Sequence, residues 1–413
     1  MRLISKKTLK EGGILLFATV LGGFLNYLFN IFIGRMLTPS EYSVVVSLFS
    51  VFVIISVPIG TIQTVVAKYT ASFNVKGDIV NIKNLILSVS NRLLIGSLLF
   101  FLIIVIFSRV IADFLHISSI LPVIFMGTIL LPASILPANR GVLQGLQKFF
   151  DYSINGIVEV SCKLLFGILL VSLGLGVSGA VFSLTLAGLI ALGISLIQLK
   201  DIYSTKTLSS ELSSGIKFYE IYKYSLNVIL NVLCFTVLTN ITMVLVKHYF
   251  ESNVAGYYAG AEIISKIILF VSGIIPILLF PKTASLYAQN IDSRRILIKS
   301  LVITALAGIC FIGFCYFLNE LIIRLFFGSK YIEGSSLLAP LSIVMTFYTL
   351  FNIMATYQLS VHKFDFLYSA VIITLLQILL IIIFHKTLFS IIIVLLGMSA
   401  MLVVFNLYYS LKK

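Results

Sequence analysis

The fold class is decided by the stretch LLFFLIIVIF at residues 98–107, which is unbroken in its apolar character. The stretch LFSIIIVLL at residues 388–396 is similar. Neither alternates polar and apolar residues as a strand of a membrane β-barrel would. Because a segment surrounded by lipid must satisfy its own backbone hydrogen bonds, such runs form α-helices. The sequence therefore predicts an all-α membrane protein.

The composition of the 413-residue chain supports this interpretation. Apolar residues make up 60% of the chain and charged residues 11%, whereas soluble domains contain about 25% charged residues. A net charge of +14 would suit a nucleic-acid binder, but the basic residues lie beside apolar segments, where membrane orientation accounts for them. We therefore expect the lipid bilayer as a partner and no nucleic acid. The four cysteines form no CxxC pair, so the sequence predicts no metal site and no cofactor.

Twelve membrane spans are predicted, since about 20 apolar residues cross the hydrocarbon layer. The first, at residues 14–34, is too long for the apolar region of a signal peptide. Most of the 29 lysines and arginines then lie on the same side as the N-terminus. The positive-inside rule therefore predicts a multi-pass protein of the cytoplasmic membrane with both termini in the cytoplasm. The spans cover residues 14–34, 42–66, 85–107, 117–138, 154–173, 177–199, 224–246, 254–279, 296–317, 337–361, 366–384 and 388–411.

A serine-rich stretch at residues 201–215 is interpreted as a cytoplasmic linker between two six-helix bundles, residues 1–200 and 216–413. The halves repeat each other, since KF at 148–149 recurs at 363–364 and Asn26 corresponds to Asn240. Because six is an even number, both bundles begin on the same side of the membrane. The sequence thus predicts parallel repeats around a central cavity, an arrangement typical of rocking transporters.

Three motifs resemble a known family. They are GRMLTPSEY at 34–42, RGVLQGLQKF at 140–149 and VAGYYAGA at 254–261. On these motifs the chain is similar to the Wzx-like O-antigen and capsule repeat-unit flippases of the multidrug/oligosaccharidyl-lipid/polysaccharide exporter superfamily. The resemblance implies a cavity lined by helices one, two, seven and eight, a polyprenyl-diphosphate-linked oligosaccharide as cargo, and polysaccharide assembly proteins as further partners. The Arg-Asp pair of lipid II flippases is absent from the first helix.

Charged residues inside spans are costly and usually face a partner or a wet cavity. Two Glu-to-Lys pairs with i,i+4 spacing lie within spans, Glu262–Lys266 and Glu159–Lys163. We interpret Lys266 as a group that attracts the cargo's diphosphate and Glu262 as the ion-coupling residue. Glu159 and Lys163 are a candidate ion pair, and a purely structural role is open for both pairs.

Neutral polar side chains are concentrated in spans one, two and seven, where they are expected to line the cavity and bind sugar hydroxyls. Helix-to-helix hydrogen bonding is the alternative for each of them. Arg140, at the cytoplasmic end of span four, could meet a diphosphate or a lipid headgroup. The predicted substrate-binding set is Asn26, Asn30, Gln63, Arg140, Asn227, Asn231, Asn240 and Lys266.

The predicted function is flipping of a lipid-linked oligosaccharide by alternating access. A cation-coupled multidrug exporter of the same superfamily is one alternative, because Glu262 would serve there too. A membrane-embedded polysaccharide polymerase is another, but the four histidines are scattered and no phosphate-binding glycine-rich loop occurs. We therefore expect a protein that is not an enzyme.

Overall fold

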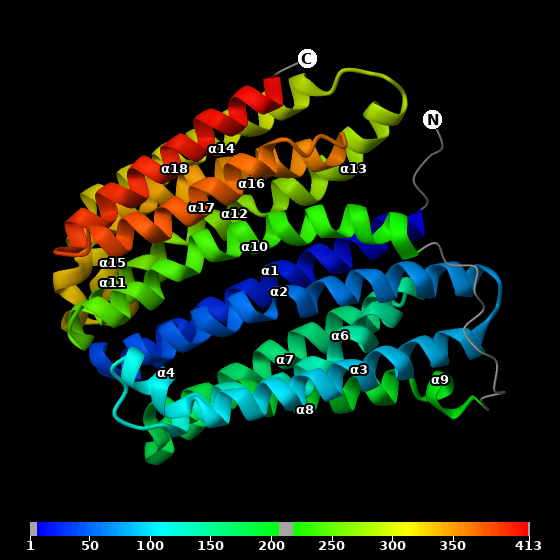
Figure 1. The fold of residues 1–413 in the computed structure, drawn as a ribbon, viewed down its shortest axis with the longest axis horizontal. Helices are drawn as coiled ribbons and strands as arrows, with labels where there is room; N and C mark the ends of the chain where they lie inside the picture. The colour runs from blue at the N-terminus through cyan, green and yellow to red at the C-terminus, as the bar shows by residue number, and fades with distance from the viewer. Residues whose placement is uncertain (1–5, 206–217, 412–413) are drawn as a thin grey trace. The chain divides into compact units, whose positions relative to one another are not determined.

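The computed structural model describes residues 6–205 and 218–411, and the regular structure within these ranges is helical (Figure 1). The helices of the first half of the chain form because long apolar runs have no other way to satisfy their backbone in lipid. They are α1 (Lys6–Met36), α2 (Pro39–Val75), α3 (Ile79–Ile106), α4 (Ser108–Phe114), α5 (Leu121–Thr128), α6 (Leu130–Gly145), α7 (Phe149–Leu170), the π-helical turn η1 (Val171–Leu175), α8 (Gly176–Gln198) and α9 (Lys200–Ser204).

The second half has the same kind of helices, with one span broken into three pieces. Lys266 and Gly273 separate α11, α12 and α13. The elements are α10 (Phe218–Tyr249), α11 (Ser252–Ser265), α12 (Ile267–Ser272), α13 (Ile274–Ala288), α14 (Arg294–Phe317), α15 (Asn319–Phe327), the 3-10 segment η2 (Ser329–Leu337), α16 (Leu338–Ser360), α17 (Phe366–Ile383) and α18 (Leu388–Leu411).

Eleven continuous helical segments among the described residues are long and apolar enough to cross a membrane. One of them, Phe149–Gln198, is 50 residues long, about 75 Å if it were straight and over twice the hydrocarbon thickness. Gly174 breaks it with a φ of 87°, and α7 then packs against α8 (Figure 1). Taken as two spans, this segment brings the number to the predicted twelve. The protein is thus an all-α polytopic membrane protein.

The internal repeat is visible in the backbone as well as in the sequence. Residues with positive φ recur in matching places, with Gly77, His116 and Gln147 in the first half corresponding to Asn290, Gly328 and His362 in the second. Each residue follows a helix, and at all of them except Gly328, whose ψ is 173°, the left-handed conformation lets the next N–H reach back to an open carbonyl. The N–H of Lys148 thus donates to Leu143 O and that of Lys363 to Gln358 O, both at 2.9 Å.

The chain divides into two compact units, and the division passes through α2. The first unit comprises Met1–Leu37 and Ile55–Phe218, and the second comprises Thr38–Ile54 and Tyr219–Lys413. Within the second unit the Tyr42 ring lies 5.4 Å from Phe327 and 6.0 Å from Tyr331, measured between ring centroids. The predicted bundle boundaries stay a prediction, and residues 206–215 of the predicted linker lie outside the described residues. The central cavity also stays a prediction.

Gly145 allows α6 to pack closely against α2 in the first unit. A Cβ on Gly145 of α6 would lie 2.5 Å from Ala67 O and 2.6 Å from Thr70 Cβ of α2, so a side chain would force these helices apart. We expect Gly145→Val to destabilise the protein by about 1–3 kcal/mol and to lower Tm in nanodiscs. The control is Gly193→Val, because a Cβ there meets nothing within 4 Å. Equal Tm values for the two variants would contradict the prediction.

Candidate functional site

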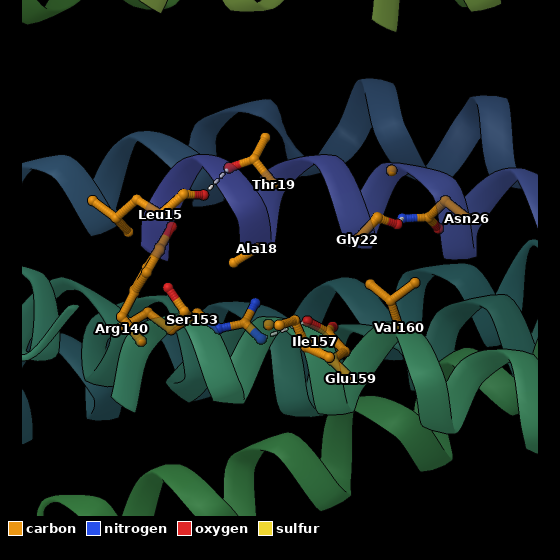
Figure 2. A pocket seen from close by; sticks show the side chains of 13 residues that line it. Leu15, Ala18, Thr19, Gly22, Asn26, Arg140, Ser153, Ile157, Glu159 and Val160 are labelled. Carbon is orange, nitrogen blue, oxygen red and sulfur yellow. Dashed lines mark hydrogen bonds and ion pairs between the residues drawn. The ribbon is translucent and has the colours of Figure 1, made fainter. Parts of the chain in front are cut away.

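A cavity of about 240 Å³ opens within the first unit among α1, α6 and α7 (Figure 2). Small residues leave the space, namely Ala18, Gly22 and Gly23 on α1 and Gly156 on α7. Polar side chains also line it, among them Asn26, Arg140, Tyr152, Ser153 and Glu159. These positions lie in helices that are apolar enough to span the membrane. The cavity is therefore lined by both polar and apolar side chains, on helices that are long and apolar enough to span the membrane.

The guanidinium of Arg140 is the best-anchored charge in this cavity. Its Nε donates to Asn155 Oδ1 at 2.8 Å, and its Nη2 donates to Glu159 Oε2 at 2.6 Å. Asn155 is fully buried and donates its own Nδ2 to Ala191 O of α8 at 2.7 Å. The side chains of Arg140 and Glu159 keep 17% and 32% of their surface exposed. A charge-assisted contact of this length fixes the guanidinium while leaving part of it open to the cavity.

A lysine and an asparagine meet one helical turn further along α7. Lys163 Nζ donates to Asn26 Oδ1 at 2.8 Å and lies 4.3 Å from the centroid of the Phe29 ring. Asn26 in turn donates its Nδ2 to Gly22 O at 3.1 Å, as Figure 2 shows for α1. Gly167 makes room for Phe29, since a Cβ there would lie 2.6 Å from the ring. These contacts attach α7 to α1 at the end of the cavity.

Gln63 of α2 does not line the cavity itself but contacts a residue that does. Its Nε2 donates to Tyr152 Oη at 3.3 Å and to Gln144 Oε1 at 3.4 Å. Tyr152 lines the cavity directly. The polar residues that the sequence predicts in spans one, two, four and five of the first half therefore lie in or beside this cavity, in separate hydrogen-bonded groups.

The second unit repeats the lysine-to-asparagine contact. Lys266 Nζ lies 3.3 Å from Asn240 Oδ1 and 3.3 Å from Glu262 Oε1. Asn240 donates its Nδ2 to Thr236 O at 2.9 Å, just as Asn26 donates to the carbonyl four residues before it. Glu262 is only 1% exposed, and its Oε2 has no hydrogen-bond partner among the described residues. The predicted Glu262–Lys266 pair is thus a direct contact, with one buried carboxylate oxygen left over.

The other predicted residues have local roles. Asn30 donates to Asn26 O at 2.9 Å along α1. Asn231 is buried, with its Oδ1 unpaired within the described part of the chain, and Asn227 is half-buried. No group of three or more histidine, cysteine or acidic residues that could hold a metal lies in the described ranges. The roles assigned to all of these residues stay predictions.

Sequence reasoning missed Ser153, which lines the cavity, and Asn155, which holds Arg140 from a fully buried position beside it. Asn155 has a sequence signal, because residues 155, 159 and 163 repeat at i,i+4 and so share one face of α7. Asn155 could have been found by extending the Glu159–Lys163 spacing one turn back. Ser153 has no such signal, because serine is common in membrane helices as a helix-to-helix contact.

These features define a class. The chain is a two-unit, α-helical, multi-pass membrane protein whose membrane-spanning helices contain charged and amide side chains. The model of the polysaccharide biosynthesis protein family matches residues 32–336. The chain therefore belongs to the polysaccharide biosynthesis protein family, and the resemblance to Wzx-like flippases is confirmed.

Similar proteins agree with this class. An uncharacterized membrane protein of Methanocaldococcus jannaschii is 25% identical over 240 residues, which cover 55% of this chain and 56% of that protein. An inward-facing multidrug resistance MATE family transporter of the MOP superfamily has the same fold, with a TM-score of 0.72 at 15% identity, covering 96% of both chains. The lipid II flippase MurJ in an inward closed conformation has a TM-score of 0.70 at 16% identity, covering 98% of this chain and 87% of its own. The chain accordingly shares the fold of these two membrane proteins.

Proposed function

We propose that this protein flips a polyprenyl-diphosphate-linked oligosaccharide across the cytoplasmic membrane by alternating access, for the assembly of cell-surface polysaccharide. The family match supports the polysaccharide context. The observation that carries the proposal is the polar cavity of the first unit, with Arg140 fixed in it by Glu159 and Asn155. A polar headgroup needs such a chamber, because moving it through hydrocarbon unpaired is costly.

The proposal assigns roles in the second unit as well. Lys266 attracts the diphosphate, and Glu262 binds the coupling ion through its unpaired Oε2. Buried carboxylates in membrane transporters commonly mark ion pathways. Both termini are placed in the cytoplasm, since most lysines and arginines then face that side. The protein acts without covalent chemistry, together with polysaccharide assembly proteins.

The second candidate, a cation-coupled multidrug exporter, is favoured by the same unpaired oxygen of Glu262 and by the fold shared with MATE transporters. The two candidate functions differ in the molecule that the protein transports. A multidrug exporter moves lipophilic cations, whereas the flippase moves a large anionic lipid.

Liposomes containing the purified protein and a fluorescent polyprenyl-diphosphate oligosaccharide test the proposal. We expect the protein to move the labelled lipid between leaflets, so that about half becomes accessible to a membrane-impermeant quencher when no gradient is applied. Protein-free liposomes from the same lipid batch set the background. Absence of protein-dependent flipping, together with export of a cationic dye down a proton or sodium gradient, would replace the flippase with the exporter.

A further inference from the structure

The cavity of the first unit has space that no side chain fills. A Cβ placed on Gly22 or on Gly156 would meet nothing within 4 Å. Both glycines line the cavity, from α1 and from α7. The absence of neighbouring atoms at two facing helices shows that the cavity is hollow where these glycines lie. A group of several heavy atoms can therefore enter without displacing the helices.

Ser153 provides independent evidence that something binds there. Ser153 is 5% exposed and lines the cavity, and its hydroxyl has no hydrogen-bond partner within the described residues. Figure 2 shows Ser153 on the side of the cavity that faces α1. Buried polar side chains are nearly always paired. The Ser153 Oγ is itself buried in this rotamer, and rotation about χ1 would bring this unpaired hydroxyl to a partner in the cavity.

The charges of the cavity select against a phosphate. Of the lining residues, Arg140 and Glu159 carry charge and neutralise each other through the 2.6 Å contact, while Lys163 lies outside the lining and donates to Asn26. A phosphate on Arg140 would lie near the Glu159 carboxylate, and like charges repel strongly away from bulk water. The carboxylate accepts hydrogen bonds only, and the guanidinium donates only. A ligand that pairs with both the Glu159 carboxylate and the Arg140 guanidinium must therefore donate one hydrogen bond and accept another.

We propose that this cavity is a sugar subsite that binds one neutral hexose of the cargo, and that the diphosphate lies elsewhere. Hexose hydroxyls donate to Glu159 and accept from Arg140, and one of them pairs with the hydroxyl of Ser153. Gly22 and Gly156 provide the room for the ring. This inference rests on the proposed function, since it treats the cavity as part of the cargo site, and it names which chemical part of the cargo the cavity recognises.

Binding selectivity tests the proposal. The protein is placed in nanodiscs free of glycoside detergent, because a sugar detergent would compete for the cavity. The probes are farnesyl diphosphate alone and four farnesyl diphosphates that each carry glucose, galactose, mannose or N-acetylglucosamine. We expect at least one glycosylated probe to bind about tenfold more tightly than bare farnesyl diphosphate, which is the value of one hydrogen bond to a charged group.

Two cavity variants and one control decide where that preference arises. Gly156→Leu fills the hollow and is expected to bring the ratio of the two affinities close to one. Ser153→Ala, a smaller change, is expected to lower the ratio severalfold. The control, Gly193→Leu, adds the same side chain to α8. Gly193 lies outside the cavity lining, and a Cβ there also meets nothing within 4 Å. We expect this control to keep the affinity ratio of the wild type. Two results overturn the proposed sugar subsite. In the first, wild-type protein binds all four glycosylated probes no more tightly than bare farnesyl diphosphate. In the second, Gly156→Leu and Ser153→Ala keep the affinity ratio of the wild type.

Flipping of the same probes, measured in parallel, separates this inference from the proposed function. Wild-type protein that flips the probes without sugar preference refutes the subsite and leaves the flippase standing. Protein that binds glycosylated probes selectively but flips none supports the subsite and refutes the flippase. Protein that neither binds nor flips any probe refutes both.

Discussion

Replacing Arg140 with glutamine is expected to lower protein-dependent flipping of a polyprenyl-diphosphate oligosaccharide by about a hundredfold. The guanidinium donates to Asn155 and to Glu159, and in the proposed function it also donates to the cargo. A hydrogen bond to a charged group contributes about 1.5–3 kcal/mol, and each 1.4 kcal/mol changes a rate tenfold. The initial rate of quencher-accessible lipid in liposomes measures this loss.

Loss of folding must be distinguished from loss of flipping in that variant. Arg140→Gln leaves Glu159, which is one-third exposed, without its nearest cation, and this alone can reduce the folded yield. The double variant Arg140→Gln/Glu159→Gln restores charge balance, so we expect near-normal folded yield and Tm with flipping lowered as strongly as in Arg140→Gln. Wild-type flipping by either variant would remove Arg140 from the cargo site.

Replacing Lys266 with methionine is expected to have the largest effect on stability. Lys266 Nζ lies 3.3 Å from Glu262 Oε1, and Glu262 is 1% exposed with its second oxygen unpaired among the described residues. Removing one partner of a buried ion pair leaves an uncompensated charge, at a cost of about 3–5 kcal/mol. We therefore expect Lys266→Met to lower Tm strongly in nanodiscs.

A second variant shows whether the charge is the cause. Glu262→Gln/Lys266→Met removes both charges and is expected to recover most of the lost stability, since well-packed neutral replacements of a buried pair are often tolerated. Lys68→Met serves as the control, because Lys68 is exposed near the end of α2. If Lys266→Met and Lys68→Met unfold at the same temperature, the Glu262–Lys266 contact does not stabilise the second unit.

The spacing of residues within a single helix explains why some contacts were predicted and others were not. The i,i+4 spacing identified Glu262 and Lys266, which contact each other within one broken span. The same spacing selected Glu159 and Lys163, yet the structure adds partners from other helices, with Arg140 on Glu159 and Asn26 on Lys163. Partners on other helices have no fixed spacing in the sequence, because helix packing and not helix geometry brings them together.

By itself the sequence determined that this protein is an all-α membrane protein of twelve spans in two repeated halves, since the length and apolar character of a segment suffice to decide whether it crosses lipid. It also singled out the polar residues inside those spans, because charge in hydrocarbon is costly wherever it occurs. Only the tertiary structure decided that Thr38–Ile54 packs with the second unit and that Ser153 and Gly156 face a hollow beside Arg140. Those outcomes depend on how side chains of distant helices fill the space between them. Local sequence patterns do not predict this packing.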